Sequence, residues 1–175
     1  MFSITEKLSQ ADLTTAFEVG SDLNSMNFSD LTLTGIDFSG KRLTGCSFAR
    51  TCFTDCIFTR TRIRISFFDF ARFVNCTFDK ADIQFSCFAG SIFDNTAFMD
   101  AELLINNFTG IVTRGCSFKD SDLYGSRFIR CTLANTPFQN CNIKKAYFTK
   151  NVYEDVSFKY SNTRVAYFDT EEFLQ

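Results

Sequence analysis

The chain has 175 residues, a length that suits a single domain. Its 20 acidic and 18 basic residues leave a net charge of −2, so charge alone favours neither nucleic acid nor an anionic membrane as a partner. No apolar run approaches the roughly 18 residues of a membrane-spanning helix, and the first residues lack the basic start and apolar centre of a secretory signal. We therefore expect a cytoplasmic protein that binds neither membranes nor nucleic acid directly.

The sequence contains no histidine, which excludes Ser-His, Cys-His and His-metal sites. It also lacks a glycine-rich phosphate loop and a dinucleotide-binding motif. We therefore expect no enzymatic activity, no cofactor and no metal.

Residues 1–20 are poorly patterned. Residues 11–15, Ala-Asp-Leu-Thr-Thr, resemble the repeat that follows them, but Glu18 then stands where a large apolar residue is expected. This segment is either a distorted first coil or a cap for the end of the structure, and residues 5–12 could form a short helix. An end cap would protect unpaired strand edges and an open core.

From Phe28 onward, a phenylalanine occurs at every tenth residue as far as Phe168. A second series lies midway between these phenylalanines, so the underlying period is five, with Thr113 and Thr163 as polar exceptions. The first series is Phe28, Phe38, Phe48, Phe58, Phe68, Phe78, Phe88, Phe98, Phe108, Phe118, Phe128, Phe138, Phe148, Phe158 and Phe168. The second is Leu33, Leu43, Phe53, Ile63, Phe73, Ile83, Phe93, Leu103, Thr113, Leu123, Leu133, Ile143, Tyr153 and Thr163.

A period of five fits neither a helix nor a strand, whose periods are about 3.6 and 2. It fits a chain that turns a corner every five residues and stacks its coils into a solenoid. Two residues before each large residue stands a mostly small one, for example Cys46, Thr51 and Ala71. The large and the small residue are predicted to point inward and the other three outward. Six of the eight cysteines fall in the small inward position, where cysteine acts as a small apolar residue, and we expect free thiols throughout.

This pattern resembles the pentapeptide-repeat proteins, whose consensus is Ala-(Asp/Asn)-Leu-X-X. Matching triplets begin at residues 11, 21, 81, 121 and 141, and the register is almost continuous over residues 21–170. The resemblance implies an all-β fold, a right-handed quadrilateral β-helix of about seven to eight coils with 20 residues each. At about 4.8 Å per coil the rod would be on the order of 35 Å long. Residues 171–175 would form a short C-terminal end.

Residues 20 apart in such a fold form columns along the rod, and one outward column is unusually apolar. Exposed apolar residues that gather in one place usually mark an interaction site. The alternative is that the N-terminal segment folds back and covers them. The candidate protein-binding patch consists of Ile65, Phe67, Phe70, Phe85, Leu104, Ile105 and Tyr124.

A neighbouring column carries three successive acidic residues, Asp82, Glu102 and Asp122. Like charges stacked at this spacing repel one another, which makes the run unusual. However, Asp and Asn are the ordinary residues of this repeat position, so the acidic ladder could equally be part of the consensus.

These features of the sequence predict two alternative functions. The first is a non-enzymatic scaffold that binds a protein through the apolar patch, with homodimerisation through the patch or a coil end as one form of binding. The second rests on the resemblance: phenylalanine and cysteine in the inward positions are similar to Qnr-type proteins, which implies a DNA mimic that protects or inhibits a type II topoisomerase, DNA gyrase. A continuous acidic stripe would favour mimicry, and an isolated apolar patch would favour the scaffold.

Overall fold

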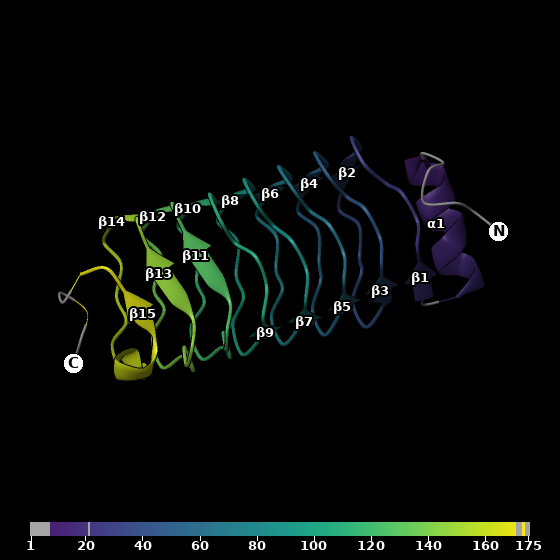
Figure 1. The fold of residues 1–175 in the computed structure, drawn as a ribbon. Coiled ribbons are helices and arrows are strands. Elements are labelled where there is room, and N and C mark those ends of the chain that lie inside the picture. The colour runs from purple at the N-terminus through teal and green to yellow at the C-terminus, as the bar shows by residue number, and fades with distance from the viewer. Residues whose placement is uncertain (1–7, 21, 171–172, 174–175) are drawn as a thin grey trace.

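The computed structural model describes residues 8–20, 22–170 and 173, which form a rod of stacked coils (Figure 1). The coils follow one another along the rod in sequence order. One helix lies across the N-terminal end. No helix in the described part of the chain has the length and apolar character needed to cross a membrane.

The helix, α1, spans Gln10–Val19. It therefore includes residues 11–15, whose interpretation as a repeat unit is wrong. The reason is local: the Ser9 side chain accepts a hydrogen bond from the Asp12 backbone N–H, while the Asp12 carboxylate accepts one from the Ser9 N–H. This capping box favours a helix start over a strand. Leu13 of α1 is fully buried in the core. The rings of Phe17 and Phe38 meet edge to face, with their centroids 5.3 Å apart.

Short parallel strands form three of the four faces of the rod. Residues paired across neighbouring coils are 20 apart, as in Leu23 with Leu43. The first face consists of β1 (Asp22–Asn24), β3 (Arg42–Thr44), β5 (Arg62–Arg64), β7 (Asp82–Gln84) and β9 (Glu102–Leu104).

The second face carries seven strands, and the third carries three. The second consists of β2 (Thr32–Thr34), β4 (Cys52–Thr54), β6 (Arg72–Val74), β8 (Ile92–Asp94), β10 (Val112–Arg114), β12 (Thr132–Ala134) and β14 (Val152–Glu154). The third consists of β11 (Arg127–Ile129), β13 (Tyr147–Thr149) and β15 (Tyr167–Phe168), and a short 3-10 helix, η1 (Thr163–Val165), precedes β15.

The fourth face is held by isolated parallel bridges, such as Asp37 with Ile57 and Ile57 with Thr77. Similar bridges extend the third face toward the N-terminus, as in Phe67 with Cys87. The predicted quadrilateral β-helix is therefore confirmed, with about seven turns.

The core is built from stacked phenylalanine rings. Phe98 is fully buried, and its ring lies nearly parallel to those of Phe78 and Phe118, with centroids 4.7 and 4.6 Å away. Phe53, Phe73 and Phe93 stack in the same way at 4.8 Å. The 20-residue register thus places identical rings at the coil spacing, and rings of neighbouring columns meet edge to face.

The small inward residues also bond the coils together. Their hydroxyl or thiol groups donate to the carbonyl oxygen of the residue 23 positions earlier, as Thr51 does to Phe28 at 2.8 Å and Cys131 to Phe108 at 3.1 Å. A buried carbonyl oxygen without a partner costs free energy, so these positions favour Ser, Thr and Cys for a reason beyond their size.

All eight cysteines are free thiols, and six of them are buried. Burial raises the pKa of Cys116 and Cys141 to about 11 and that of Cys131 to about 12. Cys87 is half-buried; burial, and then a hydrogen bond to Asp69, raise the pKa of its thiol.

We expect a thiol reagent such as Ellman's to modify Cys52 rapidly in the folded protein and Cys87 slowly. Cys52 is the exposed cysteine, and only the thiolate reacts. All eight thiols should react after unfolding in denaturant. Rapid reaction of a third thiol in the folded protein would contradict the inward placement of the other six.

Candidate protein-binding surface

Three large apolar side chains follow strands β5, β7 and β9 at one corner of the rod. Ile65, Phe85 and Ile105 are 57%, 55% and 46% exposed. Backbone hydrogen bonds link this corner from coil to coil, with the Ile65 N–H donating to Gln84 and the Phe85 N–H to Leu104, both at 3.2 Å. The three side chains therefore follow one another along the rod, and we call them the apolar corner.

The backbone at the apolar corner is strained. Ile65, Phe85 and Ile105 have φ values of 49°, 54° and 55°, in the left-handed region. For bulky or β-branched residues this conformation is an outlier that costs about 1–2 kcal/mol per residue.

All four corners adopt this left-handed turn, and long side chains such as Arg60 and Phe70 occur there as well. The opposite corner carries the residues that tolerate the turn best. Its backbone has the same conformation, with φ values from 48° to 65°, but it carries only Gly, Asp and Asn. These residues are Gly35, Asp55, Asn75, Asn95, Gly115, Asn135 and Asp155. The apolar corner therefore combines exposed apolar surface with a backbone conformation that its residues disfavour. Functional sites often hold such strain.

The other residues of the predicted patch flank the apolar corner. Phe67 is exposed on the neighbouring face and Phe70 at the next corner, where the Phe70 ring lies so close over Gly90 that a Cβ atom there would approach it to 2.6 Å. Leu104 and Tyr124 are half-buried on the strand side of the corner. Six of the seven predicted residues thus lie at the apolar corner or on the two faces that meet there, and Phe70 lies at the next corner.

The sequence left open whether the N-terminal segment folds back and covers the patch. Residues 8–20 lie at the N-terminal end of the rod, away from the middle coils that carry the patch (Figure 1). Residues 1–7 lie outside the described residues.

The acidic ladder is a mixed network rather than a uniform stripe. Asp82 forms ion pairs with Arg64 and, at 3.4 Å, with Arg62 of the preceding coil. Asp122 accepts hydrogen bonds from the Tyr124 N–H at 2.9 Å and the Asn142 amide at 3.0 Å. Glu102 is exposed between them. Much of the negative charge in this column is therefore met by neighbouring donors.

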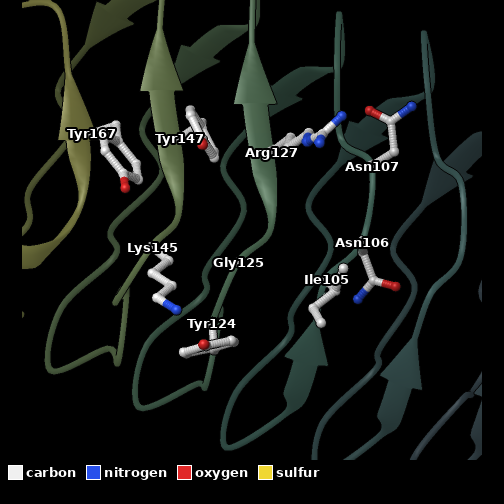
Figure 2. Close-up of a pocket in the computed structure, with 9 residues that line it drawn as sticks. All are labelled: Ile105, Asn106, Asn107, Tyr124, Gly125, Arg127, Lys145, Tyr147 and Tyr167. Atoms are coloured by element: carbon white, nitrogen blue, oxygen red, sulfur yellow. The ribbon is translucent and has the colours of Figure 1, made fainter.

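Beyond Ile105, the same edge opens into a hollow of about 490 Å³ that the sequence did not indicate to us (Figure 2). Gly125 follows Ile105 in the corner column and has no side chain to fill the space, while Tyr124, Arg127 and Lys145 surround it. At the far end Tyr147 and Tyr167 stack with centroids 4.5 Å apart. In the sequence, the signal that could have indicated this hollow is the pair of tyrosines 20 residues apart.

Lys145 is the central cation of this hollow. Its Nζ atom lies 5.6 Å from the centre of the Tyr124 ring, within cation–π range. Hydrogen bonding to Tyr124 raises the pKa of Lys145, which adds to the preference that a lysine already has for the charged form at neutral pH.

No group of three potential metal ligands occurs among the residues that the structure describes.

The five-residue period and the four-sided stack of parallel strands define a β-solenoid of five-residue repeats. The family profile described as "Pentapeptide repeats" matches in eight copies, over residues 21–60 and 107–150. The chain belongs to the pentapeptide-repeat proteins.

Solved structures with a similar chain path include other pentapeptide-repeat proteins. One is a trypsin-treated variant of QnrB1, described as a plasmid-mediated fluoroquinolone resistance protein. It is 15% identical with a TM-score of 0.49, and the alignment covers 86% of this chain and 84% of that one. Another is HetL, described as involved in heterocyst differentiation regulation, from the cyanobacterium Nostoc; it is 10% identical with a TM-score of 0.34, covering 91% and 96%. No curated protein matches the sequence.

Proposed function

We propose that this protein is a non-enzymatic scaffold that binds another protein through the apolar corner and the residues around it. The observation that carries the proposal is the contrast between two corners of equal backbone geometry. One holds only Gly, Asp and Asn, and the other holds Ile65, Phe85 and Ile105, exposed and in a disfavoured conformation.

A partner that covers the apolar corner would contribute binding free energy, which would offset the free-energy cost of the strained backbone. Large apolar and aromatic side chains near the centre of an interface commonly contribute 2 kcal/mol or more each to binding. The stiff solenoid keeps the three side chains in place before the partner arrives, so little conformational entropy is lost on binding.

The test compares proteins captured from a lysate of the source organism by the wild type and by the triple variant Ile65→Asn, Phe85→Asn, Ile105→Asn. Capture that the triple variant abolishes, and that Arg60→Gln with Lys80→Gln at another corner preserves, supports the proposal. Equal capture by all three proteins would refute it. Sedimentation of the same proteins identifies a second copy as the partner if the triple variant alone turns a dimer into a monomer.

The charge distribution argues against the DNA-mimic alternative. Mimicry requires a continuous acidic surface. Here acidic residues along the rod are interleaved with arginines, as in the ion pairs of Asp22 with Arg42 and Asp30 with Arg50.

We therefore expect that the purified protein will leave DNA gyrase supercoiling unchanged at large excess, with or without a fluoroquinolone. The reason is that the rod lacks the stripe of negative charge that would compete with DNA. Inhibition or protection at roughly stoichiometric protein in a supercoiling assay would establish the topoisomerase function instead.

A further inference from the structure

Six basic residues lie in the C-terminal half of the rod, at the edge that carries the apolar corner and on the faces and the corner next to it. All six are exposed, and within the described part of the chain none of them forms a salt bridge. They are Arg127, Arg130, Lys144, Lys145, Lys150 and Arg164.

Several arginines of the earlier coils behave differently. Arg50 pairs with Asp30 at 2.6 Å, and Arg72 and Arg114 both pair with Asp94, at 2.6 and 3.1 Å. There, each of these arginines has a carboxylate partner one coil away. Around the hollow, the corresponding outward positions in residues 104–107, 124–127, 144–147 and 164–167 contain no acidic residue. Positive charge is therefore concentrated at one place on a chain whose net charge is negative.

Each aromatic ring of the hollow already uses one of its faces. Tyr147 and Tyr167 stack on each other at 4.5 Å with an interplanar angle of 17°, and the Lys145 ammonium group lies over Tyr124. What remains for a ligand is a set of hydrogen-bond donors: the tyrosine hydroxyls, the Lys145 ammonium and the Arg127 guanidinium, which Figure 2 shows around the same opening. Such a set suits carboxylates, to which arginine binds with two parallel hydrogen bonds.

We propose that this hollow binds an acidic segment of the partner protein, next to apolar side chains of the same segment that cover the apolar corner. The inference rests on the proposed protein-binding function and specifies the chemistry of the partner. Ile105 belongs to both surfaces, since it ends the apolar corner and lines the hollow. The two surfaces therefore form one continuous site.

The dimensions of this site suit a short peptide segment. Five coil steps separate Ile65 from Val165, which is about 24 Å at the usual strand spacing. An extended segment of about seven residues spans this length at ~3.3 Å per residue. A helix would need about 16 residues at ~1.5 Å each.

Single-stranded nucleic acid fits the site less well. Nucleic-acid grooves present aromatic rings spaced so that bases stack on them, whereas here one face of each ring is already covered by the neighbouring tyrosine or by Lys145. In addition, Glu102 and Asp122 lie on the adjoining face and would repel a phosphate backbone that extends past the hollow.

The experiment measures fluorescence anisotropy with three labelled probes. The first is a twelve-residue peptide with alternating Leu and Ser in one half and Glu in the other; the second replaces each Leu by Ser; the third is a twelve-nucleotide oligo(dT). The proteins are the wild type, Arg127→Gln with Lys145→Gln, the apolar-corner triple variant, and the control Arg60→Gln with Lys80→Gln.

We expect the Leu/Glu peptide to bind best. Its affinity should fall about 10-fold in the Arg127/Lys145 double variant and in salt near 0.5 M, and less than about 2-fold in the control. The Ser/Glu peptide should bind more weakly but remain sensitive to the double variant.

The other outcomes separate this inference from the proposed function. Loss of Leu/Glu binding in the triple variant, with no effect of Arg127→Gln and Lys145→Gln, would overturn the acidic-segment inference and leave the protein-binding surface intact. Tighter binding of oligo(dT) than of either peptide would assign the hollow to nucleic acid. Equal binding by all four proteins would overturn both the inference and the proposed function.

Discussion

Phe98→Ala is expected to lower the free energy of unfolding by about 3–5 kcal/mol. The ring is fully buried and lies between Phe78 and Phe118, with edge contacts to Phe93 and Phe108. Ladder hydrogen bonds hold the neighbouring coils at fixed spacing, such as Phe98 N–H to Ser117 at 2.8 Å. The stack therefore cannot close over the missing ring, and the cavity persists. Urea unfolding followed by far-ultraviolet circular dichroism measures the loss.

Two further variants make this test specific. Met99→Ala removes an adjacent, largely outward side chain and should cost much less. Phe98→Leu retains most of the volume and should lie between the two. A loss below about 1 kcal/mol for Phe98→Ala would show that the central rings do not dominate the stability of the rod.

The core was predictable because in this fold the sequence period and the structural period are the same. Each fifth residue stands at the middle of a face and points into the interior, so inward positions such as Phe98 and even the polar Thr113 follow directly from counting. Thr113 is fully buried, and its hydroxyl pairs with that of Thr136 at 2.9 Å. That partner lies 23 residues away, and counting alone does not identify it.

Residues 11–15 show where counting fails. They fit the repeat consensus, yet they lie in α1 because the Ser9–Asp12 capping box starts a helix. A single unit of five residues contributes too little to outweigh local hydrogen bonds when its neighbour places Glu18 in a core position. Repeat matching is therefore reliable within the array and weak at its end.

The candidate surface was predictable only in part. Columns of residues 20 apart identified the apolar residues around Phe85, because large exposed side chains are visible as exceptions to the repeat. The hollow was not predicted, since Tyr124, Lys145 and Tyr147 occupy different columns and meet only across a corner that Gly125 leaves open. The backbone strain at Ile65 was missed as well, because the sequence does not reveal the sign of φ.

The triple variant Ile65→Asn, Phe85→Asn, Ile105→Asn is expected to weaken partner binding at least about 30-fold without lowering the unfolding free energy. Two effects on stability oppose each other. Removing three half-exposed apolar side chains costs roughly 0.5–1 kcal/mol each, and relief of the left-handed strain returns about 1–2 kcal/mol each because Asn tolerates this conformation. Denaturation midpoints and the affinity for the captured partner measure the two quantities.

The opposite corner supplies the matched control. Asn75 there has a φ of 53° and donates to Asp55 at 3.1 Å, while Asn95 donates to Asn75 at 3.4 Å. Asn75→Ile introduces the strain and breaks this ladder, so it should destabilise the protein by about 1–2 kcal/mol and leave partner binding unchanged. If the triple variant instead unfolded the protein, Ile65, Phe85 and Ile105 would belong to the stabilising core and their exposure would not indicate a binding surface. Because Asn75→Ile places the same kind of side chain in the same backbone conformation at another corner, it separates the cost of the strain from the contribution of the surface to binding.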